Sequence, residues 1–168
     1  MMRALPAALL ATIAFSLPAL AANDPILSRL AGEWTGHGTY QASADAAGER
    51  VFCKITNTLV QNGAALQQQG RCSVSDGSSA ISGLITASGG GRYTGTLSSM
   101  ASEGPAQFTG SGGGGRLTLN LSFIDGHTHA PANAVTTMTL SGNGYRLVST
   151  RRDGGKSWTP SDIAFKPK

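Results

Sequence analysis

The segment Asp125-Gly126-His127-Thr128-His129 contains the closest grouping of side chains able to do chemistry in this chain of 168 residues. If the segment is extended, His127 and His129 point to the same side, because side chains alternate between the two faces of a strand. Two imidazoles at that spacing suit a metal such as zinc, with Asp125 or His37 as a third ligand. The Asp-Gly pair and the proline that follows instead predict a long loop. We therefore predict no metal site, with His127 and His129 as the residues that would hold a metal if one bound, and we expect no cofactor.

The two cysteines, Cys53 and Cys72, lie in two segments that alternate apolar and polar residues. Between them stands Asn62-Gly63, the dipeptide that type I′ hairpin turns favour because both central residues need positive φ. With that turn, Cys53 faces Cys72 on the apolar side of the hairpin. A two-residue turn makes this a hydrogen-bonded pair with Cα atoms about 5.5 Å apart. We expect a bulge near Gly70 or a longer turn to ease the bond, and predict a disulfide; two buried thiols are the alternative.

The other reactive side chains form no recognisable catalytic set. No G-x-S-x-G nucleophile motif is present. Gly155-Lys156-Ser157 resembles the end of a phosphate loop but lacks the earlier glycine that such a loop requires. A disulfide would also remove both cysteines as nucleophiles. Four of the nine acidic residues directly precede a glycine, where turn geometry explains them: Asp76, Glu103, Asp125 and Asp153. We therefore expect a protein that is not an enzyme.

The first 21 residues are predicted to be a signal peptide. Arg3 provides a positive start, residues 4–20 are almost wholly apolar, and Ala19-Leu20-Ala21 fits the small-x-small cleavage rule. The apolar run is short and is interrupted by prolines, so we expect no membrane span. After cleavage near Ala21 the protein would be periplasmic or secreted, and such oxidising compartments are where disulfides form.

The net charge of +4 is concentrated near the C-terminal end of the chain. A basic rim of this kind would suit an anionic surface or ligand, although a solvated edge is the simpler interpretation. No aromatic residues are interleaved with the basic ones, as they are in platforms that bind single-stranded nucleic acid. We therefore expect no nucleic-acid partner.

Residues 22–168 are predicted to form a single all-β domain. Asp24 and Pro25 signal the start of a short N-terminal helix, which Gly32 would end. Short alternating segments then recur between glycine-rich turns, which predicts an up-and-down antiparallel β-barrel of about 8–10 strands. The expected strands are 33–41, 50–60, 65–74, 80–88, 92–99, 106–111, 116–123, 134–141, 145–152 and 157–165.

An aromatic-Thr-Gly repeat occurs at Trp34-Thr35-Gly36, Tyr93-Thr94-Gly95 and Phe108-Thr109-Gly110. The ring and the glycine share a face, where the glycine lets the strand coil or leaves room beside the ring. The barrel interior is then either fully packed or holds an apolar cavity. The candidate ligand-binding residues, which face inward, are Tyr40, Tyr93, Phe108 and Leu119.

Residues 26–35, a short helix followed by Gly32-Glu33-Trp34, resemble the G-x-W pattern of the lipocalin/calycin family. The resemblance implies an exported barrel that binds a small apolar or amphipathic molecule. It also implies that Trp34 plugs the closed end of the barrel, beneath a basic residue from a late strand. The arginines available for that role are Arg146, Arg151 and Arg152.

The chain also resembles small periplasmic inhibitors of secreted metalloproteases, which share the barrel and a comparably spaced disulfide. That resemblance implies a secreted protease as the partner, with the N-terminal stretch 22–28 inserted into its cleft. A barrel with a structural or interaction role and no ligand is the third alternative.

Overall fold

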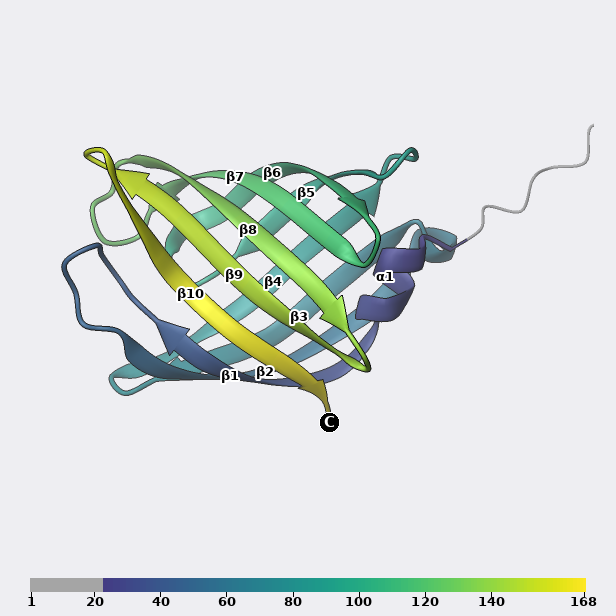
Figure 1. Cartoon of the computed structure of the whole chain (residues 1–168), viewed down its shortest axis with the longest axis horizontal. Coiled ribbons are helices and arrows are strands. Elements are labelled where there is room, and N and C mark those ends of the chain that lie inside the picture. The colour runs from purple at the N-terminus through teal and green to yellow at the C-terminus, as the bar shows by residue number, and fades with distance from the viewer. Residues whose placement is uncertain (1–22) are drawn as a thin grey trace, which may run out of the picture.

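Ten antiparallel strands form a closed barrel. A computed structural model describes residues 23–168, and the predicted signal peptide, 1–21, lies outside the described residues. Each strand pairs with its neighbours in sequence, and β1 pairs with β10 to close the sheet (Figure 1). The predicted all-β, up-and-down barrel is confirmed. Its strands are β1 (Gly32–Tyr40), β2 (Glu49–Val60), β3 (Ala65–Val74), β4 (Gly77–Ala87), β5 (Arg92–Ser98), β6 (Ser102–Gly113), β7 (Arg116–Asp125), β8 (Pro131–Ser141), β9 (Gly144–Asp153) and β10 (Lys156–Pro167).

The short helix α1 (Pro25–Leu30) lies against one end of the barrel (Figure 1). The Asp24 carboxylate caps it, accepting hydrogen bonds of 3.0 Å from the backbone N–H groups of Ile26 and Leu27. Such a cap satisfies donors that have no partner within the first turn. The apolar side of the helix is buried: Ile26, Leu27 and Leu30. No helix in the described part of the chain is long and apolar enough to cross a membrane.

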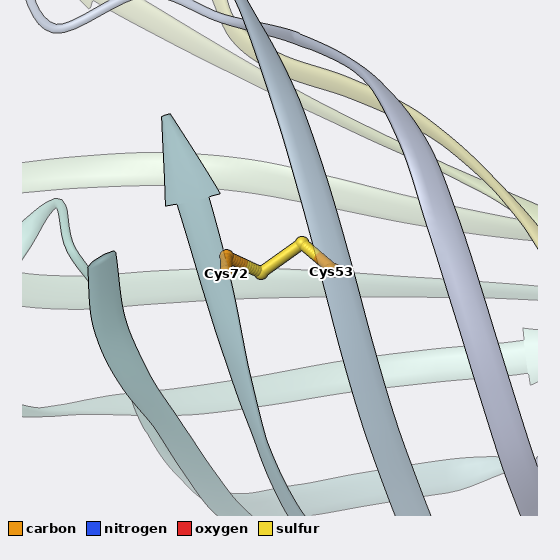
Figure 2. Close-up of a disulfide and its surroundings, with 2 residues drawn as sticks. All are labelled: Cys53 and Cys72. Carbon is orange, nitrogen blue, oxygen red and sulfur yellow. A yellow bond between two sulfur atoms is a disulfide. The ribbon is translucent and has the colours of Figure 1, made fainter. Parts of the chain in front are cut away.

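Cys53 and Cys72 face each other across β2 and β3 and form the predicted disulfide (Figure 2). Their Cα atoms are 4.1 Å apart. That distance is close to the roughly 4.5 Å of a non-hydrogen-bonded pair, not to the 5.5 Å of a hydrogen-bonded one. The facing residues are therefore as predicted, but the hydrogen-bonding alternation along the hairpin is the opposite.

The cause is a turn that is longer than two residues. The ladder ends at the pair Val60 and Ala65, which leaves residues 61–64 as the connection. Asn62 and Gly63 have positive φ, as predicted, but Gln61 also has a positive φ of 51° and so leaves the ladder. When the loop is extended by one residue on each side, the same residues still face each other. Each hydrogen-bonded pair becomes a non-hydrogen-bonded pair, and the reverse. Of the two expected features, the longer turn is present. The bulge near Gly70 is not, because the register across Gly70 is regular.

The glycines of the aromatic-Thr-Gly repeat make room for side chains on the neighbouring strand. Gly36 faces Phe165, and a Cβ at position 36 would lie 2.5 Å from the phenyl ring. Gly95 faces Phe108, whose ring would lie 2.7 Å from an added Cβ. The rings fill the volume that the glycines release, so the half of the barrel near α1 is packed.

Trp34 is buried in this packed half, where the plug is expected. Its Nε1 donates a 2.9 Å hydrogen bond to the carbonyl oxygen of Leu30, and its ring meets Tyr145 edge to face at 4.9 Å between centroids. The expectation of an arginine over Trp34 is wrong. A neutral ring packs here without the desolvation that a buried charge would require. The three arginines lie elsewhere: Arg146 and Arg152 are exposed, and Arg151 lines the opposite half of the barrel.

Candidate ligand-binding cavity

The barrel interior is hollow in the half away from α1, where a cavity of about 130 Å³ lies. The connection 99–101, at the barrel end opposite the helix, contributes to its wall. The rings of Tyr145 and Phe165, stacked at 4.5 Å, stand at its inner end. The side walls are mainly apolar and come from strands all around the barrel: Val51, Ile55, Ile81, Leu97, Leu121, Leu147 and Ile163, with the disulfide. The space therefore suits an apolar guest.

Of the four candidate ligand-binding residues, Tyr40 lines the cavity. Tyr93, Phe108 and Leu119 are buried among the side chains of the packed half and are not part of the cavity wall. Tyr93 also has a structural contact, since its hydroxyl donates to the carboxylate of Asp24 at 2.9 Å. Burial and that carboxylate raise the Tyr93 pKa far above its usual value. These three residues face inward as predicted but lie at the other end of the barrel.

Arg151 and Asp125 form a buried ion pair beside the mouth of the cavity, 8% and 4% exposed. The guanidinium group also lies over the rings of Phe123 and Trp158, 5.5 and 5.2 Å from their centroids. Trp158 is held in turn by a 2.8 Å hydrogen bond from its Nε1 to Asp153. One side of the cavity mouth is therefore closed by an ion pair without net charge and by two aromatic rings.

The Asp125 pKa is lowered to about 2. Burial alone would raise it, but hydrogen bonds from Arg151 and from the backbone N–H groups of Thr128 and His127 outweigh that effect. The carboxylate is therefore ionised at neutral pH. The paired charges give the mouth little net attraction for a free anion.

A second, more polar hollow of about 240 Å³ lies outside the first. It includes Gln41, Ala42 and the start of the connection after β7. The two hollows share several residues, and these mark the passage from the rim to the apolar interior: Tyr40, Met100, Ala101, Arg151 and Pro160.

The candidate metal ligands His127 and His129 do not share a face, because the segment is a turn and not an extended strand. Asp125 Oδ1 accepts 2.8 Å hydrogen bonds from the N–H groups of His127 and Thr128, and its other oxygen pairs with Arg151. His129 Nδ1 lies 2.7 Å from Glu103, which raises the His129 pKa. Residues 23–168 contain no group of three or more His, Cys, Asp or Glu side chains able to hold a metal.

Polar side chains on the cavity wall are residues that the sequence analysis missed. Gln68 is 9% exposed and lines the cavity, as do Thr136 and Ser149, whose hydroxyl oxygens are 2.7 Å apart. The alternation of side chains along each strand could have identified these residues. Gln68 is an even-numbered residue of β3 like Leu66 and Cys72, so its side chain belongs on their inner face.

Comparisons with known proteins do not assign the chain to a family. Neither the protein-family models nor the curated proteins that were searched match it. The closed antiparallel barrel is compatible with a lipocalin/calycin-like fold. Function therefore has to be inferred from the cavity.

Proposed function

We propose that the protein binds one small apolar or amphipathic molecule inside its barrel and catalyses no reaction on it. The observation that carries the proposal is the apolar cavity of about 130 Å³ within an otherwise packed interior. In an unrelated protein, an apolar cavity of roughly 150 Å³ stays dry and binds benzene. A ligand of about that size fits here, as does the end of a longer chain whose polar group stays at the rim.

The proposed setting is an exported, oxidising compartment, as for lipocalin-like carriers. The disulfide between Cys53 and Cys72 supports this, because such bonds persist outside the reducing cytosol. The bond lies on the cavity wall, where it ties two strands of the pocket together.

The protease-inhibitor alternative is less well supported. It requires residues 22–28 to enter a protease cleft, yet Ile26 and Leu27 are buried, the latter 0% exposed. Freeing them would break the Asp24 cap and uncover the barrel end, which costs about 1.5–3 kcal/mol for each apolar side chain.

The test is titration of the mature protein, labelled on its methyl groups, with benzene and toluene while NMR spectra are recorded. We expect saturable shifts for the cavity methyls of Ile55, Leu121 and Ile163. The methyls of Leu66 and Leu117, in the packed half, serve as the internal control and should not shift. Haem should not bind, because the cavity is far too small for it. Absence of saturable shifts up to the solubility limit would leave the structural or interaction role.

A further inference from the structure

A relay of amide groups connects helix α1 to the wall of the cavity. Asn57 Nδ2 donates a 2.8 Å hydrogen bond to the carbonyl oxygen of Leu30, and Gln68 Nε2 donates a 3.1 Å hydrogen bond to Asn57 Oδ1. A carbonyl oxygen can only accept, so it turns the Nδ2 group of Asn57 toward itself. Asn57 Oδ1 then faces Gln68 and turns the Nε2 group of that residue inward. The end of the helix thus sets the orientation of the Gln68 amide.

Gln68 is the last member of the relay and lines the cavity. Nε2 gives one of its two N–H groups to Asn57, and Oε1 is the only acceptor of this amide; no residue within 23–168 donates a hydrogen bond to Oε1. The Nε atom of Arg151 also lacks a partner among the described residues, but it is fully enclosed by protein. The Gln68 oxygen is different because it adjoins open space, so a guest can reach it.

Two of the other polar sites on the cavity wall already have partners within the protein. The hydroxyls of Thr136 and Ser149 pair with each other at 2.7 Å. Arg151 is paired with Asp125 at the mouth. Gln68 therefore presents an acceptor, fixed in direction, to an apolar space.

We infer that the cavity selects a small apolar molecule with one hydrogen-bond donor, a hydroxyl or N–H group, which donates to Gln68 Oε1. This inference rests on the proposed function and adds the class of ligand. A guest without a donor would enclose this oxygen without giving it a partner, which costs more than an ordinary hydrogen bond contributes.

The test compares phenol with toluene, which differ in a hydroxyl and a methyl group of similar size. The dissociation constant of each is measured for the wild-type protein, for Gln68→Met and for Thr136→Val. Gln68→Met keeps the side-chain length and removes the amide, whereas Thr136→Val removes a polar group from another part of the same wall. Comparing the phenol-to-toluene ratio between variants cancels the different solubilities of the two ligands.

We expect Gln68→Met to weaken phenol relative to toluene about tenfold, the loss of one hydrogen bond to a buried acceptor. Thr136→Val should change the ratio less than twofold. A second readout uses the wild type alone: phenol should move the ¹³Cδ NMR signal of Gln68 downfield of its position with toluene, because a hydrogen bond to Oε1 deshields that carbon while both rings exert a similar ring-current shift. An unchanged ratio with the same Gln68 signal for both ligands overturns this inference while the apolar cavity still binds. Failure of the wild type to bind either ligand overturns the proposed function as well.

Discussion

Arg151 and Asp125 form a buried ion pair in which each charge depends on the other. Removing one partner of such a pair leaves the remaining charge buried and uncompensated, which typically costs about 3–5 kcal/mol. We expect Asp125→Asn to lower the free energy of unfolding by about that amount at pH 7, as measured by urea denaturation. Glu103→Gln, which removes the exposed carboxylate beside His129, is the matched control and should cost less than about 1 kcal/mol. Equal effects of the two substitutions would contradict the ion-pair interpretation.

The same carboxylate predicts a pH dependence of stability. The Asp125 pKa is about 2 in the folded protein, against an ordinary value of 3.8. Between these two pH values Asp125 binds fewer protons in the folded state than in the unfolded state. Its contribution to stability is therefore complete above pH 3.8 and is lost as the pH falls through about 2. The stability gap between the wild type and Asp125→Asn should therefore narrow across that window, measured by urea denaturation at each pH. A gap that stays constant from pH 5 to pH 2 would show that Asp125 is not the titrating group.

For single residues, the sequence could predict which face of a strand a side chain occupies. The position of that side chain along the barrel axis was not inferred. Tyr93, Phe108 and Leu119 have the inward alternation that was expected, yet they lie in the packed half. Their depth does follow from the connections: in an up-and-down barrel alternate turns lie at the same end. Tyr93 is the second residue after the turn 89–91, which lies at the end of the barrel near α1, and so cannot lie deep in the other half. Gln68 and Thr136 were missed because inward faces were inferred from apolar residues alone.

At the scale of elements, the hairpin of β2 and β3 is held together by its disulfide. The bond closes a loop with a sequence separation of 19 residues. Removing a native disulfide from a small exported domain typically costs about 2–5 kcal/mol. We expect the double substitution Cys53→Ala and Cys72→Ala to lower stability by that amount in denaturant titrations. Dithiothreitol should reproduce the loss in the wild type and have no effect on the double variant; a wild type that is indifferent to the reductant would contradict the prediction.

Helix α1 is fastened by the Asp24 carboxylate, which caps the helix and accepts from Tyr93 on β5. Asp24→Ala removes both functions, so we expect a loss of about 1–2 kcal/mol in the free energy of unfolding. Asp24→Asn keeps a capping oxygen and should cost less. Tyr93→Phe removes only the hydroxyl, worth about 0.5–1.5 kcal/mol. If Asp24→Ala and Tyr93→Phe gave strictly additive losses in the double variant, the two residues would not be coupled as the 2.9 Å contact implies.

The strands and the helix could be predicted because each is marked by local chemistry: alternation within it and glycine or a cap at its ends. The turn at Asn62 and Gly63 shows the limit of that information. The dipeptide identifies the turn and the facing pairs, but the positive φ of Gln61 has no signal in a residue type that rarely adopts it. The hydrogen-bonding alternation at the cysteines followed from that one residue.

At the scale of the whole molecule, the barrel has two unlike halves joined by continuous strands. Near α1, rings fill the spaces beside Gly36 and Gly95, and Trp34 bonds to the helix end. Beyond Tyr145 and Phe165 the same strands enclose the cavity. The strands keep their antiparallel pairing through both halves, so the difference between the halves lies mainly in the side chains. Which half would be hollow was not predicted from the sequence, because cavity volume depends on all ten strands together.

This division predicts opposite responses to added side-chain volume in the two halves. Gly36→Ala places a Cβ 2.5 Å from the Phe165 ring, so it should destabilise the protein by about 1–3 kcal/mol in urea denaturation. Ala134→Leu adds three carbons on β8, where the side chain borders the cavity, and buries them in empty space. We expect it to leave stability unchanged or raise it by up to about 2 kcal/mol, and to weaken toluene binding at least tenfold. If Ala134→Leu instead lost as much stability as Gly36→Ala, the second half would also be packed, and the barrel would have no room for a ligand.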